Sequence, residues 1–349
     1  MRFDVSAVVV SHRSACEALN CVKSLRGAFR EEGIAGEVIL VDCDSGADDV
    51  RLLETAGADR LLPLAENRGY AGGVNAGLAV ASSSRLLLSN ADVLFRAGSV
   101  APLLESVDEP AVGAAAPLAY WDSNDRVRLP PGWAPGFFSD LAQLTAGRRL
   151  ARRQRWFASF ARETLRLWEY GGNARHLAGA ALAVRRGVFD RVGRFDERFP
   201  FEYEETEWED RVLARKMLLR FVPRSRVRHL WGVSAVASPG ASARRAESRR
   251  IYWRRRYGRL GRAILERASR SSRVSDFPRI VQPRLAARPG ACVAISTNPS
   301  LLPFAAASLE EDFVLPEEIA ARLPRASLYL RAFRASDGRP LQTLVWEKE

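Results

Sequence analysis

The first 120 residues of this chain alternate short apolar runs with segments of helical spacing or turn chemistry. The apolar runs lie at residues 5–11, 37–42, 59–64 and 85–90. Runs of this length bounded by turn signals are typical of buried strands. Strands that alternate with helices build βαβ units around a parallel sheet, so the pattern predicts an α/β fold.

Residues 14–32 provide the helical side of this alternation. Their apolar positions fall on one stripe of a helix, at Ala18, Val22, Leu25 and Phe29. Ser14 precedes the stripe, at a position where serine commonly caps a helix. We therefore expect an amphipathic helix between the first two strands.

The composition indicates a globular protein of a reducing compartment. The 349 residues suffice for one large domain and a smaller one. The four cysteines lie at Cys16, Cys21, Cys43 and Cys292. Because they show no metal-ligand spacing and are too sparse for a disulfide scaffold, we expect a cytoplasmic location.

Neither a secretory signal nor a spanning helix is expected. Asp4 precedes only a short apolar run, which is not the pattern of a signal peptide. No apolar run approaches the roughly 20 residues that a spanning helix needs. Any membrane contact would therefore be peripheral, at the inner face of the cell membrane.

The net charge of +12 comes from the middle of the chain, residues 121–280. Two segments there, 148–168 and 243–268, mix arginine with aromatic residues at helical spacing. Such helices lie on an anionic membrane, bind nucleic acid, or pack their aromatic face on the protein. Packing with a solvated basic rim is the default expectation, and no specific nucleic-acid target is expected.

Polar residues follow the predicted strands where open α/β sheets place their ligand contacts. Asp42 and Asp44 leave the second strand and enter a turn. A carboxylate there accepts hydrogen bonds from a base or ribose, or it forms an Asx-turn or helix cap. The turn role is favoured for Asp44 and the ligand role for Asp42.

A glycine-rich loop follows the third strand, in the segment NRGYAGGVNAGL at residues 67–78. Glycines at such a loop let backbone amides approach an anionic ligand at the head of a helix. After the fourth strand, SNADV places Asn90 and Asp92. A carboxylate there can hold Mg²⁺ or Mn²⁺ together with phosphate oxygens, or it caps the next turn.

In this order, the three patterns resemble the nucleotide-sugar half of the family 2 glycosyltransferases, inverting enzymes with a GT-A fold. The resemblance implies a nucleotide-sugar-binding set comprising Ser11, Asp42, Asn67, Arg68, Gly69, Gly72, Gly73, Asn75 and Asn90. It also implies a divalent cation held by Asp92 and by His229, which follows a strand-like segment. The usual D-x-D is here N-x-D, as in rhamnosyltransferase-like members, which favours a donor such as dTDP-rhamnose.

Residues 176–211 resemble the acceptor block of the same family. Gly179, Ala180 and Asp196 match its acceptor side. Spacing from the G-x-F-D-E turn puts the catalytic acidic pair at Glu204 and Glu205, with Glu205 as the base. The family commonly has Glu-Asp there, so the literal pair at 209–210 competes. His12 and His176 lack a comparable context.

Beyond residue 278 the chain shows a linker-like passage, then short apolar runs separated by Asn-Pro and Asp-Gly signals. This pattern predicts a small β-sandwich-like domain at 279–349. It would follow a GT-A catalytic domain at 1–278, with a nucleotide-sugar half at 1–120 and an acceptor half at 121–278. The small domain could support a homodimer, bind carbohydrate or cover the catalytic domain.

The resemblance implies an inverting transfer of a sugar from a nucleotide-diphospho-sugar to a hydroxyl of a glycan, a lipid-linked or a small-molecule acceptor. Two alternatives remain open. A non-catalytic relative that binds a polyanion or a partner would also explain the missing D-x-D and the basic helices. A sugar nucleotidylyltransferase would need a glycine-rich loop after the first strand, which SHRSACEAL lacks.

Overall fold

The computed structural model describes residues 3–133, 135–145, 150–231, 240–270, 277–323 and 327–348. These form two compact units. Unit 1 comprises residues 1–119 and 171–252, and unit 2 comprises residues 120–170 and 253–349. The predicted domain boundary at residue 278 therefore does not coincide with a unit boundary, and the domain division stays a prediction.

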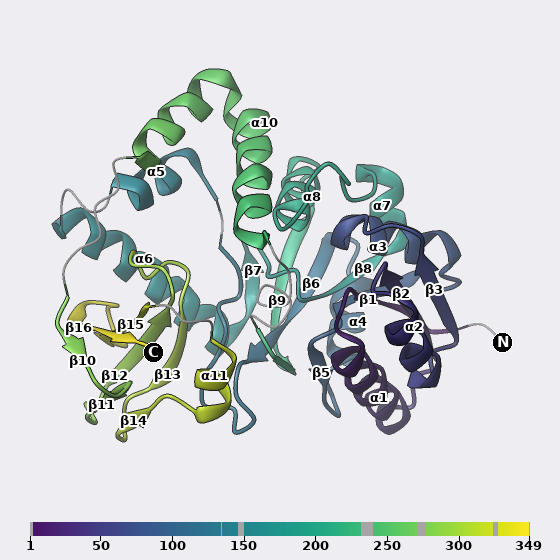
Figure 1. Cartoon of the computed structure of the whole chain (residues 1–349), viewed down its shortest axis with the longest axis horizontal. Coiled ribbons are helices and arrows are strands. Elements are labelled where there is room, and N and C mark those ends of the chain that lie inside the picture. Colours follow the sequence, from purple (N-terminus) through teal and green to yellow (C-terminus); the bar gives the residue numbers. More distant parts are fainter. Residues whose placement is uncertain are drawn as a thin grey trace. The chain divides into compact units, whose positions relative to one another are not determined.

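Unit 1 is built on a mixed sheet of order β3-β2-β1-β4-β8-β6-β9-β5, with β7 paired to β9 (Figure 1). The strands are β1 Val5–Ser11, β2 Gly36–Cys43, β3 Arg60–Leu64, β4 Arg85–Asn90, β5 Val93–Phe95, β6 Val112–Tyr120, β7 Gly172–Ala174, β8 Ala181–Arg185 and β9 Leu218–His229. The first four strands are parallel, and β8 is antiparallel to β4. The predicted α/β class and its first four strands are confirmed.

Helices cover both faces of the unit 1 sheet. They are α1 Ala15–Glu32, α2 Ala47–Leu53, α3 Gly69–Val80, α4 Ala101–Asp108, α7 Arg186–Val192 and α8 Glu204–Ala214, with the 3-10 turn η1 Glu54–Ala56. The predicted stripe of α1 is buried, in a core that includes Val5, Ala7 and Val9 of β1. Because side chains alternate along a strand, Val8 and Val10 point to the opposite face, where α3 packs.

Glycines bring α3 close to that face. A Cβ on Gly73 would lie 2.5 Å from Val10 Cγ1, and one on Gly77 would lie 2.3 Å from Val8 Cγ1. Gly77 and Gly73 therefore serve helix–sheet packing, which a side chain would disrupt. This packing fixes the head of α3 near the carboxyl ends of β1 and β2.

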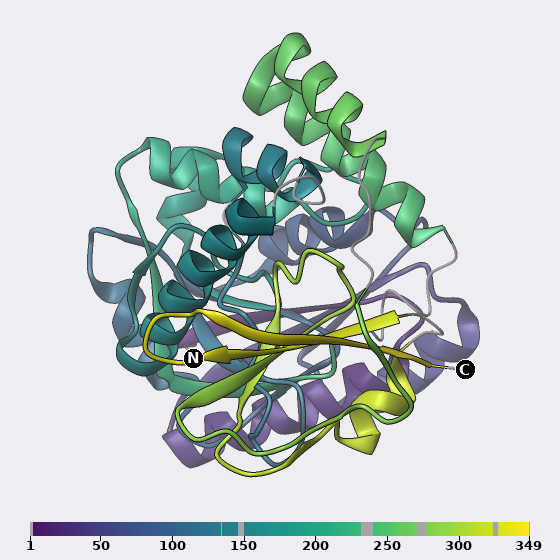
Figure 2. The same cartoon turned by 90° about the vertical axis from the view of Figure 1, so that its left-hand side faces the viewer.

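Unit 2 has a five-stranded sheet of order β10-β16-β15-β12-β13 and a two-stranded β11-β14 sheet, drawn in green and yellow in Figure 2. The strands are β10 Arg279–Ile280, β11 Arg284–Leu285, β12 Ala291–Ser296, β13 Ala305–Ser308, β14 Phe313–Val314, β15 Ser327–Arg334 and β16 Pro340–Glu347. The predicted C-terminal β region is confirmed. The passage interpreted as linker-like, residues 281–290, instead supplies β11, which pairs with β14.

The helices of unit 2 are α5 Phe137–Thr145, α6 Leu150–Tyr170, α11 Glu317–Arg322 and the second part of α10 Ala241–Arg270, which Gly258 interrupts at φ 70°. Phe157 of α6 stacks on Phe304 with ring centroids 5.1 Å apart and meets Phe333 edge-on. The first arginine-rich segment therefore packs its aromatic face on the C-terminal sheet, as the default interpretation predicted.

Candidate active site

The carboxyl ends of the parallel strands gather the predicted polar residues at one edge of the unit 1 sheet. Ser11 is in register with Asp42, and Val10 with Asn90. The backbone N–H of Asn90 donates to the Ala180 carbonyl at 2.9 Å. The start of the acceptor block thus adjoins the end of β4.

Both oxygens of buried Asp42 accept hydrogen bonds from Ser45. The Ser45 hydroxyl lies 2.5 Å from Asp42 Oδ1, and its amide 3.0 Å from Oδ2. The turn considered for Asp44 is thus stabilised by the Asp42 side chain, while Asp44 occupies the left-handed region at φ 59°. The nucleoside role of Asp42 stays a prediction.

The head of α3 is shaped by its own side chains. Asn67 Oδ1 accepts the Gly69 amide at 2.9 Å, and Gly69 adopts φ 67°, which favours glycine. A Cβ on Gly72 would lie 2.3 Å from Arg68 Cβ. Several glycines of this loop therefore have a packing reason, and phosphate binding by the loop stays a prediction.

The Glu197 side chain connects α3 to the G-x-F-D-E turn, which spans residues 193–197. Its Oε2 pairs with Arg68 Nη2 at 2.6 Å, and its Oε1 accepts from Asn75 Nδ2 at 2.9 Å. Asn75 Nδ2 also donates to the Phe195 carbonyl at 2.9 Å. The side chains of Arg68 and Asn75 thus join the two halves of the site.

Asp92 and His229 meet although 137 positions separate them in the chain. The β5–β9 pairing sets Val93 opposite His229, and the Leu230 amide donates to the Asp92 carbonyl at 2.9 Å. His229 Nε2 lies 3.3 Å from Asp92 Oδ1. That oxygen is buried and has no hydrogen-bond partner in the structure.

An orphaned carboxylate oxygen beside an imidazole fits a divalent cation. Leaving such an oxygen buried without a partner is costly, and a cation removes the cost. Within the described ranges no three His, Cys, Asp or Glu side chains gather into a metal site. The chain thus offers two ligand groups, with Asn90 at the end of the adjacent β4.

Glu204 and Glu205 begin α8, after Glu202 and Tyr203 at φ 61° and 73°. Such backbone in non-glycine residues is strained and is often found at functional sites. Gly179 makes room for Glu205, the predicted base, since a Cβ there would lie 2.9 Å from Glu205 Cγ. Burial raises the pKa of Glu205 to about 7, although the charge of His176 acts in the opposite direction. Burial and the charge of Glu205 raise the pKa of Glu204 well above its usual range.

Tyr70 is a site residue that the sequence analysis missed. Its hydroxyl lies 3.3 Å from the Gly179 carbonyl, next to Glu205. Burial, followed by the charges of Glu204, Glu205 and Asp92, raises the pKa of Tyr70 well above its usual range. Tyr70 thus lies within electrostatic reach of both the predicted base and the predicted metal ligand.

The competing pair at 209–210 is engaged elsewhere. The buried Glu209 carboxylate contacts His176 Nδ1 and accepts the Leu177 amide, and Asp210 Oδ2 accepts the Tyr252 hydroxyl at 2.8 Å. These contacts favour 204–205 as the catalytic pair. On the acceptor side, Asp196 pairs with Arg198 at 2.7 Å.

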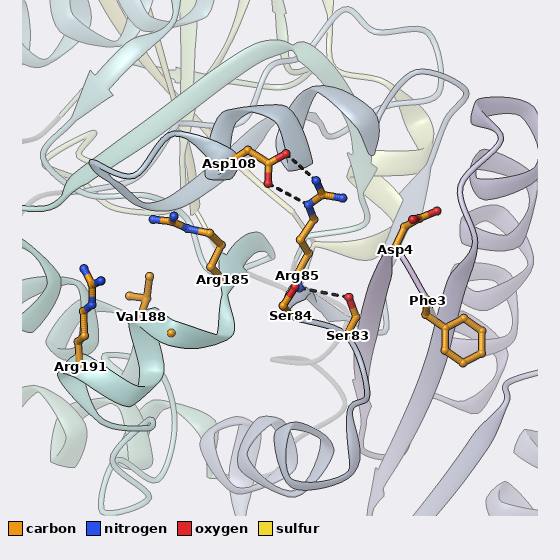
Figure 3. A pocket seen from close by; sticks show the side chains of 10 residues that line it. Phe3, Asp4, Ser83, Ser84, Arg85, Asp108, Arg185, Val188 and Arg191 are labelled. Carbon is orange, nitrogen blue, oxygen red and sulfur yellow. Dashed lines mark hydrogen bonds and ion pairs between the residues drawn. The ribbon is translucent and has the colours of Figure 1, made fainter. Parts of the chain in front are cut away.

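A pocket of about 540 Å³ lies at the opposite edge of the same sheet (Figure 3). Its lining includes Asp4 before β1, Arg85 at the start of β4 and Arg185 at the end of β8. Arg85 pairs with Asp108 at 2.7 Å, so this charge is already compensated. Because ligands of open α/β sheets bind at the carboxyl ends, we place the active site at the other edge.

The α/β sheet with carboxylates gathered at its carboxyl edge is that of a glycosyltransferase of the GT-A class. Residues 6–193 match the family model for glycosyl transferase family 2, and the chain belongs to this family.

Among curated proteins, the chain is 29% identical over 188 residues to N-acetylglucosaminyl-diphospho-decaprenol L-rhamnosyltransferase of Mycobacterium tuberculosis. That match covers 49% of this chain and 58% of the relative. Succinoglycan biosynthesis protein ExoO of Rhizobium meliloti is 33% identical over 114 residues, covering 32% of this chain and 31% of the relative. The chain thus matches less than two thirds of either relative's length.

A solved structure, the mannosyltransferase PcManGT from Pyrobaculum calidifontis in complex with GDP-Man and Mn²⁺, aligns with a TM-score of 0.44 at 15% identity. The alignment covers 77% of this chain and 74% of that one. Of the helices that the structure describes, none is both long and apolar enough to span a membrane.

Proposed function

We propose that this protein transfers a sugar from a nucleotide-diphospho-sugar to an acceptor hydroxyl with inversion. The observation that carries the proposal is the junction at residues 179–180. Gly179 lies against Glu205, and the Ala180 carbonyl binds the Asn90 amide two residues before Asp92. The candidate base, Glu205, and the strand end that precedes the candidate diphosphate anchor, Asp92, therefore both contact this short segment, which supports the proposal.

In this proposal Glu205 accepts the proton of the acceptor hydroxyl while that oxygen forms a bond to the anomeric carbon. The bond between this carbon and the diphosphate oxygen breaks, and its electron pair leaves with the diphosphate. Since attack and departure occur on opposite faces, the configuration inverts. A carboxylate with a pKa near 7 suits this role at neutral pH.

Asp92 and His229 would hold Mg²⁺ or Mn²⁺, with Asn90 nearby and phosphate oxygens completing the coordination. Such a cation neutralises charge that develops on the leaving diphosphate. The N-x-D sequence and the named activity of the mycobacterial relative support dTDP-rhamnose as the donor.

The test is release of nucleoside diphosphate from UDP-, dTDP- and GDP-sugars, with water or simple glycosides as acceptors. We expect turnover of one donor, with a loss of roughly 10² to 10⁴-fold in Glu205→Gln. Glu207→Gln is the matched control, because Glu207 pairs with Arg211 on the same helix at 2.9 Å. Equal turnover in wild type and Glu205→Gln would contradict the assignment.

We also propose a peripheral contact between residues 253–268 of α10 and an anionic membrane, which suits a lipid-linked acceptor. Leu260 and Ile264, one turn apart, are 76% and 40% exposed and lie among exposed arginines. Exposed apolar residues flanked by basic ones are typical of helices that lie in a membrane interface.

Vesicle binding tests this contact. Neutralising Arg254, Arg255 and Arg256 should weaken partitioning onto phosphatidylglycerol vesicles. The control neutralises Arg279, Arg284 and Arg334, exposed arginines with the same total charge. Equal partitioning of the two variants would contradict the contact. Strongly salt-sensitive binding to any polyanion, without donor turnover, would instead favour the non-catalytic alternative.

A further inference from the structure

His176 and Glu209 form a buried ion pair near the predicted base, Glu205, which lies one helical turn before Glu209 on α8. The His176 side chain is 8% exposed and that of Glu209 is 2% exposed, and the Glu209 carboxylate contacts His176 Nδ1. The Leu177 amide also donates to this carboxylate. Glu209 therefore fixes both the orientation of the imidazole and the backbone beside it.

This orientation directs the other ring nitrogen toward the start of α8. With Nδ1 on Glu209, His176 Nε2 lies 3.5 Å from Thr206 Oγ1, and Thr206 adjoins Glu205. Glu205 and Glu209 are four positions apart, which places them on one face of the helix. The imidazole thus lies between the Glu209 carboxylate and the Thr206 hydroxyl, within electrostatic reach of Glu205.

The base needs such a partner. Glu204 and Glu209 of α8, and Glu202 just before this helix, lie around Glu205, and Tyr70 faces it from α3. A carboxyl group that is partly buried among carboxylates favours the protonated form, which cannot accept a proton. His176, on the segment before β8, supplies positive charge to Glu205, while Arg245 pairs with Glu202 at 2.6 Å.

We propose that His176, fixed by Glu209, is a positioning residue that keeps the Glu205 carboxylate ionised and ready to accept the acceptor's proton. The inference rests on the proposed transfer reaction. The charges of Glu209, Glu205 and Asp210 outweigh burial and raise the pKa of His176, which favours its charged form.

The first test needs no substrate, because the chain has only three histidines. Imidazole resonances followed by NMR should give His176 a titration midpoint above 6.5. Because coupling between two sites is reciprocal, Glu205→Gln should lower this midpoint by roughly half a unit to one unit. Glu209→Gln should lower it further, and Glu207→Gln should leave it unchanged. An unchanged midpoint in Glu205→Gln would overturn the proposal.

The second test is the pH profile of donor turnover in His176→Gln. Without the cation, Glu205 stays protonated to higher pH, so the acidic limb should move up by about one unit. Turnover should then fall about tenfold on that limb and recover above it. A uniform loss at every pH would indicate a structural role and overturn the inference. A wild type without turnover would instead contradict the proposed function itself.

Discussion

Both compact units bury carboxylates, but they use them differently. In unit 2, Asp122 accepts the Arg126 and Val127 amides, and Asp140 accepts Trp253 Nε1 at 2.9 Å. In unit 1, Asp92 Oδ1 and Glu204 Oε2 are buried without a hydrogen-bond partner. Buried polar groups without hydrogen-bond partners cost stability. Their retention at one edge of the unit 1 sheet therefore indicates a ligand site.

The first test of this comparison adds a methyl group beside the predicted base, Glu205. Gly179→Ala would set a Cβ 2.9 Å from Glu205 Cγ and displace the carboxylate. We expect donor turnover to fall by roughly 10²-fold, because small displacements of a reacting group are costly. Gly187→Ala is the control, since nothing lies within 4 Å of its Cβ. Equal turnover in both variants would show that Glu205 needs no special placement.

The second test removes a structural carboxylate. Asp122→Ala should lower the free energy of unfolding by about 1–3 kcal/mol, because the buried Val127 amide and the partly buried Arg126 amide lose their acceptor. Urea denaturation measures this loss. Nucleotide binding by the folded protein should be unchanged. Weakened nucleotide binding would mean that the carboxylates of unit 2 are not purely structural.

The third test uses pH and stability. Folding raises the pKa values of Glu204, Glu205 and His176. The stability that these groups contribute is therefore fully present below their pKa values in the unfolded state. It is lost as the pH rises through their pKa values in the folded state. Urea unfolding measured from pH 5 to pH 8 should show this decline in the free energy of unfolding. Glu204→Gln should flatten it. A stability that rises over this range would contradict the assignment.

The sequence could predict those features of unit 1 that depend on local patterns. The strands of unit 1 and the buried stripe of α1 follow from local apolar periodicity, which the sequence carries directly. The meeting of Asp92 with His229 was expected only through the family resemblance, and the β5–β9 pairing is its physical cause.

The sequence could not predict the contacts made across long separations. His176 was set aside as lacking context, yet its partner Glu209 lies 33 residues away on α8. Glu197 reaches Arg68 across 129 residues. Local patterns do not encode such pairs, although the spacing of Glu205 and Glu209 on one helical face was a usable signal. The grouping of residues 120–170 with the C-terminal sheet was missed for the same reason.

The central claim is that the carboxyl edge of the unit 1 sheet, with Asp92, binds a nucleotide diphosphate. Calorimetry of UDP, dTDP and GDP, with and without Mn²⁺, tests it directly in the wild type and in Asp92→Ala. The account predicts metal-dependent binding of one nucleotide, weakened at least about tenfold in the variant. Absence of binding by the wild type, or equal binding by Asp92→Ala, would contradict it.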